Sequence, residues 1–553
     1  MKYRVWLVLA SALMLLAGLA ARVNPGHWPV SRESTTPVPM DNVTVFAFSQ
    51  VNPGEADPQV LDLAPDISIS GWQRWDRDGT RAGDYNTSFV KSCQAAGVRF
   101  IGGTTASVLF RDEAASDAEF LDWATRDAAG SLTPRSSFHP PAYRASLANP
   151  SYREYLIGIG KLQIDAGVDG LFFDELNGDY QGVAYDNNEG FDDYHLADFS
   201  AFLISNLPPG ADLRSRYGWN PAYQTPRPQR PGQPQPAFNY RAYLAEHDWS
   251  ATPFAPANPL AAEWGRSTGN HPPANAANFV DQAEPYLYFR PIAMALRAYA
   301  RQKYGRSLLL TSNGIWPFTD FQSVGLYDYN SYGPGDSNTD FCPLTSDGHL
   351  NGSVSLQSTL VNIRNLSAQT APGALVALFI DWPTPLLDRY NALPLSERED
   401  YWRMYAAEAY ANGLFFAFHL RTTTGEPTAT QAGVMALFKS LAEFYRAHAS
   451  LYHAVVPSAA SASVTVPGAM IAITDQASPN RRIVHIVNHQ YDGAFIAQSN
   501  VVLTVDAAAA PTAVNLASPD LAKDEAVPFS WAAGKLTVTL PSLIAYDIVT
   551  VSW

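Results

Sequence analysis

The chain has 553 residues, of which 46% are hydrophobic and 16% are charged. This length suits a large domain with an accessory one, and the composition supports a sizeable core rather than disorder. The formal net charge of -15 argues against nucleic acid or an anionic membrane surface as the main partner, because both bind basic patches.

Residues 1–21 have the pattern of an export signal peptide. A positively charged start precedes the apolar run 5–19, and residues 18–20 offer small side chains for cleavage. An uncleaved membrane anchor is the alternative, but the run is shorter than the ~20 residues that span a bilayer. Residues 22–41 are polar and contain proline, which predicts a linker. We therefore expect a secreted or periplasmic protein, and we find no later spanning candidate in the sequence.

Eight short apolar runs alternate with helical patterns between residues 42 and 455, and this alternation predicts a parallel sheet. Eight such units over roughly 400 residues predict a (β/α)8 barrel. The alternative, an open doubly wound sheet, usually carries a Gly-rich phosphate loop after its first strand, and the sequence has none there. The expected strands are 43–48, 67–71, 98–102, 167–173, 307–311, 324–328, 375–380 and 413–418. The expected helices are 87–96, 117–127, 150–162, 194–206, 279–304, 356–366 and 397–412.

The fourth expected strand organises the chain. Asn149 suits a helix N-cap and Pro150 suits the first helical position, so a helix should precede the strand. Leu171, Phe172 and Phe173 form an uninterrupted apolar run, as in a strand that is buried on both faces. The run stops at two carboxylates. Asp169, just before it, is expected to cap the turn into the strand.

Two later regions break this rhythm. Residues 207–277 are rich in Pro, Gln, Asn and Ala, and we interpret them as an insertion that forms a lid or a wall of the binding site, with disorder as the alternative. From residue 456 helical periodicity stops. Strand-like runs at 463–466, 469–473, 482–487, 501–505 and 536–540 predict that residues 456–553 form an antiparallel β-sandwich.

Polar residues follow the expected ends of the last five barrel strands, and several aromatic residues lie among them. Because the carboxyl ends of barrel strands meet at one face, we expect these side chains to converge. The candidate catalytic residues are Asp174, Glu175, Asp328 and Asp381, and the candidate substrate-binding residues are Trp72, Trp75, Asn313, Trp316, Tyr327, Trp382, His419 and Arg421.

Acids ringed by aromatic side chains suit the cleavage of a glycosidic bond. One carboxyl group protonates the leaving oxygen, and a second attacks the anomeric carbon or activates water. Adjacent strand residues point to opposite faces, so we favour Asp174 as catalytic, with Glu175 pairing a neighbouring Arg or entering the site. Asp328 and Asp381 are either functional or part of loop structure. The Trp residues either contact substrate or fill the barrel mouth.

The sequence offers little for other chemistries. Cys93 and Cys342 are the only cysteines, which is too few for a disulfide framework or a metal cluster. A single bridge and two buried thiols both stay open. The run 192–195, Asp-Asp-Tyr-His, lacks metal-ligand spacing and is more typical of a helix start. We found no Gly-x-Ser-x-Gly or His-Glu-x-x-His motif, so neither a serine esterase nor a zinc peptidase is indicated. We expect no cofactor and no metal.

The segments 148–155 and 167–175 resemble a recurring pattern in (β/α)8 glycoside hydrolases. This group includes the dextranase and cycloisomaltooligosaccharide glucanotransferase family and the α-galactosidase-like clan, and residues 408–413 and 444–448 are also similar to it. The resemblance implies a nucleophile at the end of the fourth strand, Asp174, and an acid/base at the end of the sixth, Asp328. The dextranase-like pattern has a Glu at the latter place and this chain has none nearby, so Glu175 and Asp381 are the substitutes.

The sequence therefore predicts an exported glycoside hydrolase whose partner is a poly- or oligosaccharide. A non-catalytic carbohydrate-binding barrel and a transglycosylase with the same site are the alternatives. The oligomeric state is not indicated.

Overall fold

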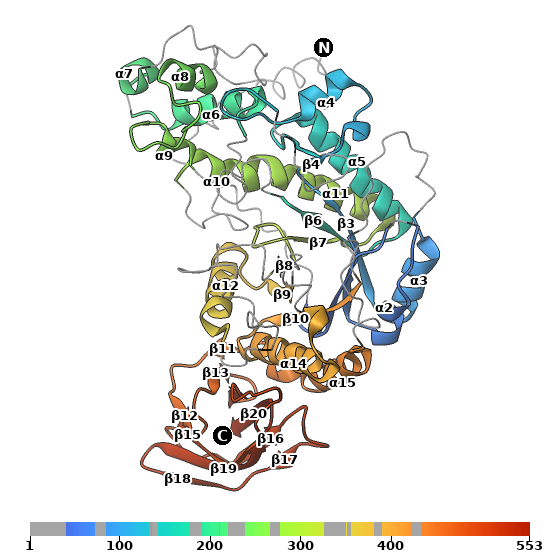
Figure 1. Ribbon diagram of the computed structural model, residues 1–553, viewed down its shortest axis with the longest axis vertical. Coiled ribbons are helices and arrows are strands. Elements are labelled where there is room, and N and C mark those ends of the chain that lie inside the picture. Colours follow the sequence, from blue (N-terminus) through green and yellow to red (C-terminus); the bar gives the residue numbers. More distant parts are fainter. Residues whose placement is uncertain are drawn as a thin grey trace, which may run out of the picture.

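The computed structural model describes a barrel followed by a β-sandwich, with a helical region above the barrel (Figure 1). It describes residues 40–52, 54–71, 85–132, 134, 142–176, 190–208, 211–218, 238–265, 277–325, 350, 355–380, 390–421 and 433–553.

Eight parallel strands form the barrel, which confirms the predicted fold class. In sheet order the strands are β7 (Leu309–Ser312), β6 (Gly170–Asp174), β3 (Arg99–Thr105), β2 (Ile67–Ile69), β1 (Phe46–Ser49), β10 (Phe415–Arg421), β9 (Leu375–Phe379) and β8 (Phe321–Gly325). In the sheet, β7 and β8 are the two outermost strands. Isolated β-bridges from Asn313 and Gly314 to Ser323 connect these two edges and nearly close the barrel.

The sixth barrel strand, β8, begins three residues earlier than predicted. Buried polar residues hide its start: the side-chain amide of Gln322 bonds the backbone of Trp316 in both directions, and the hydroxyl of Ser323 lies 2.9 Å from that of Thr311. Asp320 fixes the entry to the strand by accepting a hydrogen bond from the Leu310 amide at 2.7 Å. The prediction relied on the apolar pattern and therefore placed the start of this strand at residue 324 instead of 321.

Helices follow the strands on the outside of the barrel and also build the region above it (Figure 1). They are α2 (Pro58–Leu63), α3 (Thr87–Ala95), α4 (Asp117–Trp123), α5 (Pro150–Ala166), α6 (Asp193–Ser205), α7 (Leu213–Tyr217), α8 (Tyr240–Glu246), α9 (Ala261–Trp264), α10 (Phe279–Ala283), α11 (Arg290–Tyr304), α12 (Gln357–Thr370), α14 (Leu395–Ala411) and α15 (Met435–Ala447). The predicted helices lie within a few residues of their expected positions, whereas α2, α7, α8, α9 and α15 were not predicted.

The expected single helix 279–304 is divided. A π-helical segment, η3 (Glu284–Phe289), separates α10 from α11. Pro285 at its start lacks the amide proton that a continuous helix would use, which accounts for the change of hydrogen-bond register.

Helix α5 and strand β3, which is the neighbour of the fourth barrel strand β6, are connected by side-chain hydrogen bonds. Asn149 caps α5 by accepting from the Ser151 amide at 2.9 Å, and Pro150 occupies the first turn, as predicted. Near the other end, buried Gln163 accepts from the Gly103 amide at 2.8 Å and donates to the Gly103 carbonyl at 2.7 Å. A Cβ on Gly103 would lie 2.3 Å from the carbonyl oxygen of Phe172, so only glycine lets β6 approach this closely.

The described parts of the insertion 207–277 are packed, so the disorder alternative does not apply to them. Trp264 on α9 is buried, and its ring lies 4.6 Å from that of Phe191, 4.7 Å from that of Phe199 and 5.3 Å from that of Phe279. This aromatic core joins the insertion to α6 and α10 above the barrel (Figure 1).

The C-terminal sandwich has two antiparallel sheets with a core of their own between them. The six-stranded sheet also packs against α14, and its residues Met470, Ile483 and Tyr546 belong to the barrel's hydrophobic core. That sheet has the order β11 (Val456–Pro457), β13 (Met470–Gln476), β14 (Arg481–Val487), β20 (Tyr546–Ser552), β16 (Ala513–Ala517) and β17 (Glu525–Ala526). The four-stranded sheet has the order β12 (Ala462–Val464), β15 (Gln498–Asp506), β19 (Lys535–Leu543) and β18 (Phe529–Ala532).

Two remaining sequence predictions concern the membrane and the cysteines. Among the helices that the structure describes, none combines the length and apolarity that crossing a bilayer requires. The expected signal peptide, 1–21, lies outside the described residues, as does the expected linker, 22–41, except for its last two residues. Cys93 is buried with a free thiol, and Cys342 lies outside the described residues.

Candidate functional site

Asp174 ends β6 at the carboxyl end of the barrel, where its side chain is half-buried. The Asn313 side-chain amide, just beyond β7, donates to Asp174 Oδ1 at 3.1 Å, and the Glu175 backbone amide donates to the same oxygen at 2.9 Å. Two side chains predicted for the site therefore meet, although they lie on successive strands 139 residues apart in the chain. Both donors stabilise the ionised carboxylate.

Glu175 points elsewhere. Its carboxylate forms an ion pair with Arg144, whose side chain is fully buried, and its backbone carbonyl accepts from the Ser107 hydroxyl at 2.6 Å. The pairing with an Arg confirms one of the two roles predicted for this residue. Glu175 also has a φ of 48°, in the left-handed region that residues with a Cβ seldom adopt. Such strain persists only where its surroundings hold it, and it is common at functional sites.

The eighth barrel strand, β10, carries His419 and Arg421. Burial lowers the pKa of His419 to about 4, although a hydrogen bond with the backbone of Ile380 opposes the shift. The imidazole is therefore neutral at pH 7, and it lies against the rings of Phe48 and Trp402. Arg421 is partly exposed and pairs with Glu55 at 2.5 Å.

Trp316 was predicted either to contact substrate or to fill the barrel mouth. Its side chain is fully buried, with its ring centre 6.5 Å from that of Phe289. The amide and carbonyl of the same residue are held by Gln322. The indole is thus packed inside the protein in this structure, and a substrate contact by Trp316 stays a prediction.

Half of the predicted site lies outside the described residues. These residues are Trp72, Trp75, Tyr327, Asp328, Asp381 and Trp382.

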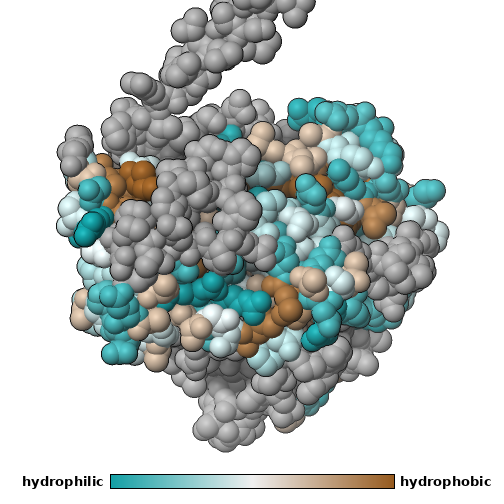
Figure 2. Space-filling model, turned by 90° about the horizontal axis from the view of Figure 1, so that it is seen from above, coloured by the Kyte–Doolittle hydropathy of each residue, from teal (hydrophilic) through white to brown (hydrophobic). Residues whose placement is uncertain are grey.

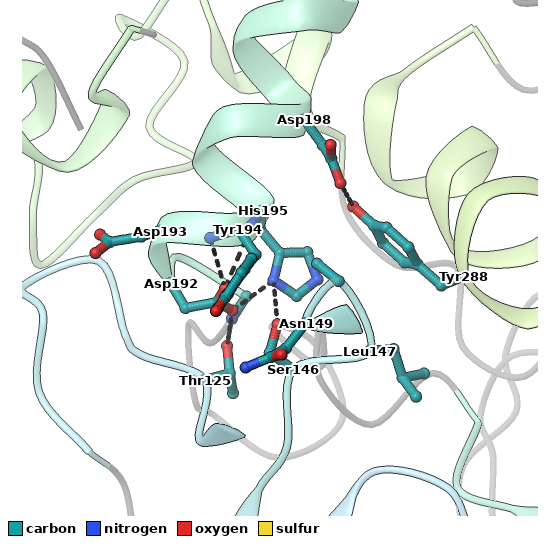
Figure 3. Close-up of polar contacts among 12 residues, drawn as sticks. Thr125, Ser146, Leu147, Asn149, Asp192, Asp193, Tyr194, His195, Asp198 and Tyr288 are labelled. Carbon is teal, nitrogen blue, oxygen red and sulfur yellow. Dashed lines mark hydrogen bonds and ion pairs between the residues drawn. The ribbon is translucent and has the colours of Figure 1, made fainter. Parts of the chain in front are cut away.

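A buried polar cluster that sequence reasoning missed lies at the start of α6 (Figure 3). Asp192, the N-cap of α6, accepts from His195 Nδ1 at 2.5 Å and from the Thr125 hydroxyl at 3.0 Å, and the Ser146 hydroxyl lies 3.3 Å from the same His195 nitrogen. Burial raises the pKa of Asp192, but the charge and hydrogen bond of His195 outweigh it and hold this pKa at about 2.

The cluster joins the start of α6 to the segments that carry Thr125 and Ser146, and it does not resemble a nucleophilic triad. Ser146 and Asp192 meet the same imidazole nitrogen, whereas a triad needs the serine on the other one. Ser146 lies two residues after Arg144, so one short segment connects His195 to the ion pair at Glu175. The capping role of Asp192 confirms that this run starts a helix. Contacts between residues so far apart in the chain leave no local spacing pattern, and no sequence signal could have found them.

The region also contains a buried acid. Glu113 accepts from the Phe110 amide at 2.6 Å and from the Tyr155 hydroxyl at 2.8 Å. Burial raises the pKa of Glu113 to about 8 despite these two hydrogen bonds. The described residues contain no group of three or more His, Cys, Asp or Glu that could hold a metal ion.

The face seen from the end that carries α4 and α6 to α9 is largely polar where the structure describes it. Apolar residues form small separate patches among hydrophilic ones (Figure 2). Small patches of this kind are ordinary on a soluble protein.

Comparisons with known proteins identify the fold. No protein-family model matches the chain, and a search of curated proteins finds no significant match. A cycloisomaltooligosaccharide glucanotransferase from Paenibacillus sp., solved with cycloisomaltoheptaose, is similar with a TM-score of 0.54 and 10% identity over 93% of this chain and 85% of that one. An α-L-fucosidase from Paenibacillus thiaminolyticus gives 0.49 and 9%, and a maltogenic α-amylase from Thermotoga neapolitana gives 0.48 and 12%, each over 93% of this chain and 99% of the other. At this identity the likeness to the glucanotransferase establishes a shared fold.

Proposed function

We propose that this protein is an exported glycoside hydrolase in which Asp174 is the essential carboxylate. One observation carries the proposal: a half-buried carboxylate ends the fourth strand of a (β/α)8 barrel and accepts a hydrogen bond from Asn313 on the fifth. Its chain fold is shared with a glycoside-processing enzyme. Catalytic groups of such barrels sit at the carboxyl ends of their strands.

In the proposed reaction Asp174 attacks the anomeric carbon while a second carboxylic acid gives its proton to the leaving oxygen. Water then releases the sugar from the enzyme, and the second carboxyl group takes up the proton of that water. The amides of Asn313 and Glu175 donate to one oxygen of Asp174 and orient the carboxylate for this attack. The acid is assigned to Asp328, at the end of the sixth predicted strand, or to Asp381, which follows the seventh.

Glu175 has a different role in this scheme. Its ion pair with buried Arg144 turns its carboxylate toward the loop beside the strand, and a carboxylate with a fixed positive partner is a poor proton donor. Glu175 therefore positions the end of β6 and does not take part in the chemistry.

A panel of polysaccharides tests the proposal. Purified protein is incubated with dextran, soluble starch, β-glucan and xylan, and new reducing ends and product sizes are followed over time. Hydrolysis is expected to release shorter chains and to raise the number of reducing ends. Products longer than the substrate, without a rise in reducing ends, would indicate a transglycosylase. Binding without any product over long incubation would indicate a carbohydrate-binding barrel and would contradict the proposal.

A further inference from the structure

We propose that the C-terminal sandwich carries a second saccharide-binding surface, built on Trp531 and Trp553 on either side of the loop 507–511. We call these two residues and the loop the aromatic platform. The choice of a saccharide as ligand rests on the proposed function, whereas the existence of a binding surface rests on the contacts below.

The first observation is the exposure of β18, an edge strand that pairs only with β19. All four of its residues are exposed. Phe529 and Trp531 lie two residues apart and therefore on the same face, and 38% and 39% of their surfaces are exposed. An indole left this open on a folded domain is unusual, and Trp is a residue type that concentrates at binding sites.

The second observation is that the two indoles are anchored to one loop. Trp531 Nε1 donates to the carbonyl of Ala507 at 2.8 Å, and Trp553 Nε1 donates to the carbonyl of Ala509 at 3.0 Å. These carbonyls are two residues apart and thus no more than about 7 Å from one another. Because the polar edge of each ring is satisfied within the protein, the rings are held in place and little conformational entropy is lost when a ligand binds.

The third observation concerns what surrounds the rings. Ala508, Ala509 and Ala510 are exposed and have no side chain long enough to cover an indole. Asp506 and Lys535 form an exposed ion pair at one end of this loop. The Asp506 carboxylate can accept hydrogen bonds from the hydroxyls of a ligand, and the Lys535 ammonium can donate to them.

Charged side chains also lie beside Trp553. The guanidinium of Arg482 lies 5.6 Å from the centre of the Trp553 ring and pairs with Asp475 at 2.7 Å. Trp553 is partly buried and packs against the core of the sandwich, so Trp531 supplies the open aromatic surface of the platform, and paired donors and acceptors lie near both rings.

A saccharide fits this combination. The C–H face of a pyranose is apolar and slightly positive, so it stacks on the electron-rich face of an indole, while its hydroxyls bond the polar groups at the rim. An anionic lipid surface fits poorly, because the basic residues here are paired with acids and the chain has a net charge of -15. A second copy of the chain also fits poorly, because β18 has only four residues and therefore offers few backbone hydrogen bonds for pairing along its edge.

Native affinity electrophoresis tests the inference. The inactive Asp174→Asn protein, which does not digest the gel, is run through gels that contain dextran, soluble starch, β-glucan or xylan. We expect retardation by at least one polysaccharide, and we expect Trp531→Ala and Trp553→Ala, each added to this background, to weaken binding at least ~10-fold. Tyr304→Ala, which removes an exposed aromatic ring from the barrel side, is the matched control and should bind normally.

Three results would overturn the inference. They are the absence of retardation in every gel, unchanged retardation of both Trp variants, and a concentration-dependent dimer that Trp531→Ala abolishes. The proposed function is judged separately from the activity of the otherwise wild-type enzyme on short oligosaccharides, which Trp531→Ala should leave within about twofold. A protein that binds polysaccharide through Trp531 but cleaves nothing would refute the hydrolase and support the platform. A protein that cleaves oligosaccharides but binds equally well without Trp531 and Trp553 would support the hydrolase and refute the platform.

Discussion

Asp174 and Glu175 are neighbours in the chain but have different surroundings. The first accepts hydrogen bonds at the carboxyl end of the barrel, and the second pairs with buried Arg144. The strand ends at Asp174, and Glu175 adopts a left-handed backbone with a φ of 48°, so its side chain leaves the strand in another direction. The alternation expected of a continuous strand had allowed the sequence to favour Asp174. The sequence could predict that Glu175 pairs with an Arg but not with which one, because Arg144 lies on the separate two-residue strand Tyr143–Arg144 before α5.

Replacing Glu175 or Arg144 should show whether this ion pair serves stability or catalysis. Glu175→Gln should retain activity within about tenfold, because its role is positional. Arg144→Leu should lower the free energy of unfolding by about 3 kcal/mol, because it leaves a carboxylate without its partner at a largely buried site. Urea unfolding and initial rates measure the two effects. If Glu175→Gln loses as much activity as Asp174→Asn, Glu175 takes part in the reaction.

Glu113 gives the protein a pH-dependent weakness. Its pKa is about 8 in the folded chain and ordinarily 4.5, so it folds in the protonated form. The stability that it contributes is complete below pH 4.5 and is lost as the pH rises toward 8, at roughly 1.4 kcal/mol per pKa unit. The side chain of Glu113→Gln does not titrate. The melting temperature of this variant minus that of the wild type should therefore increase as the pH is raised from 5 to 8.5.

A constant difference between Glu113→Gln and the wild type over that range would contradict this assignment. The variant is a fair comparison, because a glutamine can still accept from the Phe110 amide and contact the Tyr155 hydroxyl.

At the scale of elements, the contact between α5 and β3 supports the strand that carries the site. Gln163→Leu should lower the free energy of unfolding by about 2–4 kcal/mol, because it leaves the amide and carbonyl of Gly103 buried without their partner. Gln94→Leu is the matched control. That glutamine is exposed where it donates to the Gly167 carbonyl, and its loss should cost under about 1 kcal/mol. Equal losses for the two variants would contradict the role given to Gln163.

The barrel strands were predictable because most of them are apolar runs that follow a helical pattern. Prediction failed where buried polar residues interrupt that pattern, as at Gln322 and Ser323 in β8. In the sandwich, β20 was missed although it lies at the centre of its sheet, since Asp547 breaks its apolar run.

The site was predictable to the extent that it depends on strand ends. Position along the barrel was sufficient to bring Asn313 to Asp174. It could not reveal that Trp316 is buried, because the turn that buries it is fixed by Gln322 six residues later. The cluster around His195 depends on packing between loops, which no spacing in the sequence encodes.

At the scale of the whole molecule, the barrel and the sandwich share an interface rather than a flexible connection. Glu408 on α14 and His489 after β14 are buried and lie 3.3 Å apart, and Gln357 on α12 donates to the Ile471 carbonyl at 2.8 Å. Apolar residues of the six-stranded sheet complete the core over α14 and α15.

Removing the sandwich should therefore damage the barrel. A chain that ends at residue 455 exposes the apolar surfaces of α14 and α15, so we expect it to aggregate or to bind a hydrophobic dye far more strongly than the full chain does. A soluble, monomeric fragment with a sharp thermal transition would show that the barrel is independent.

The central claim is that Asp174 performs the chemistry of a glycosidic site at the barrel mouth. The most direct measurement compares the rate at which the wild type and Asp174→Asn cleave the substrate found in the polysaccharide panel, after circular dichroism has established equal folding. We predict a loss of at least ~10³-fold, because the asparagine side chain can neither attack the anomeric carbon nor carry the required charge. An Asp174→Asn protein that cleaves within a few-fold of the wild-type rate would contradict the claim.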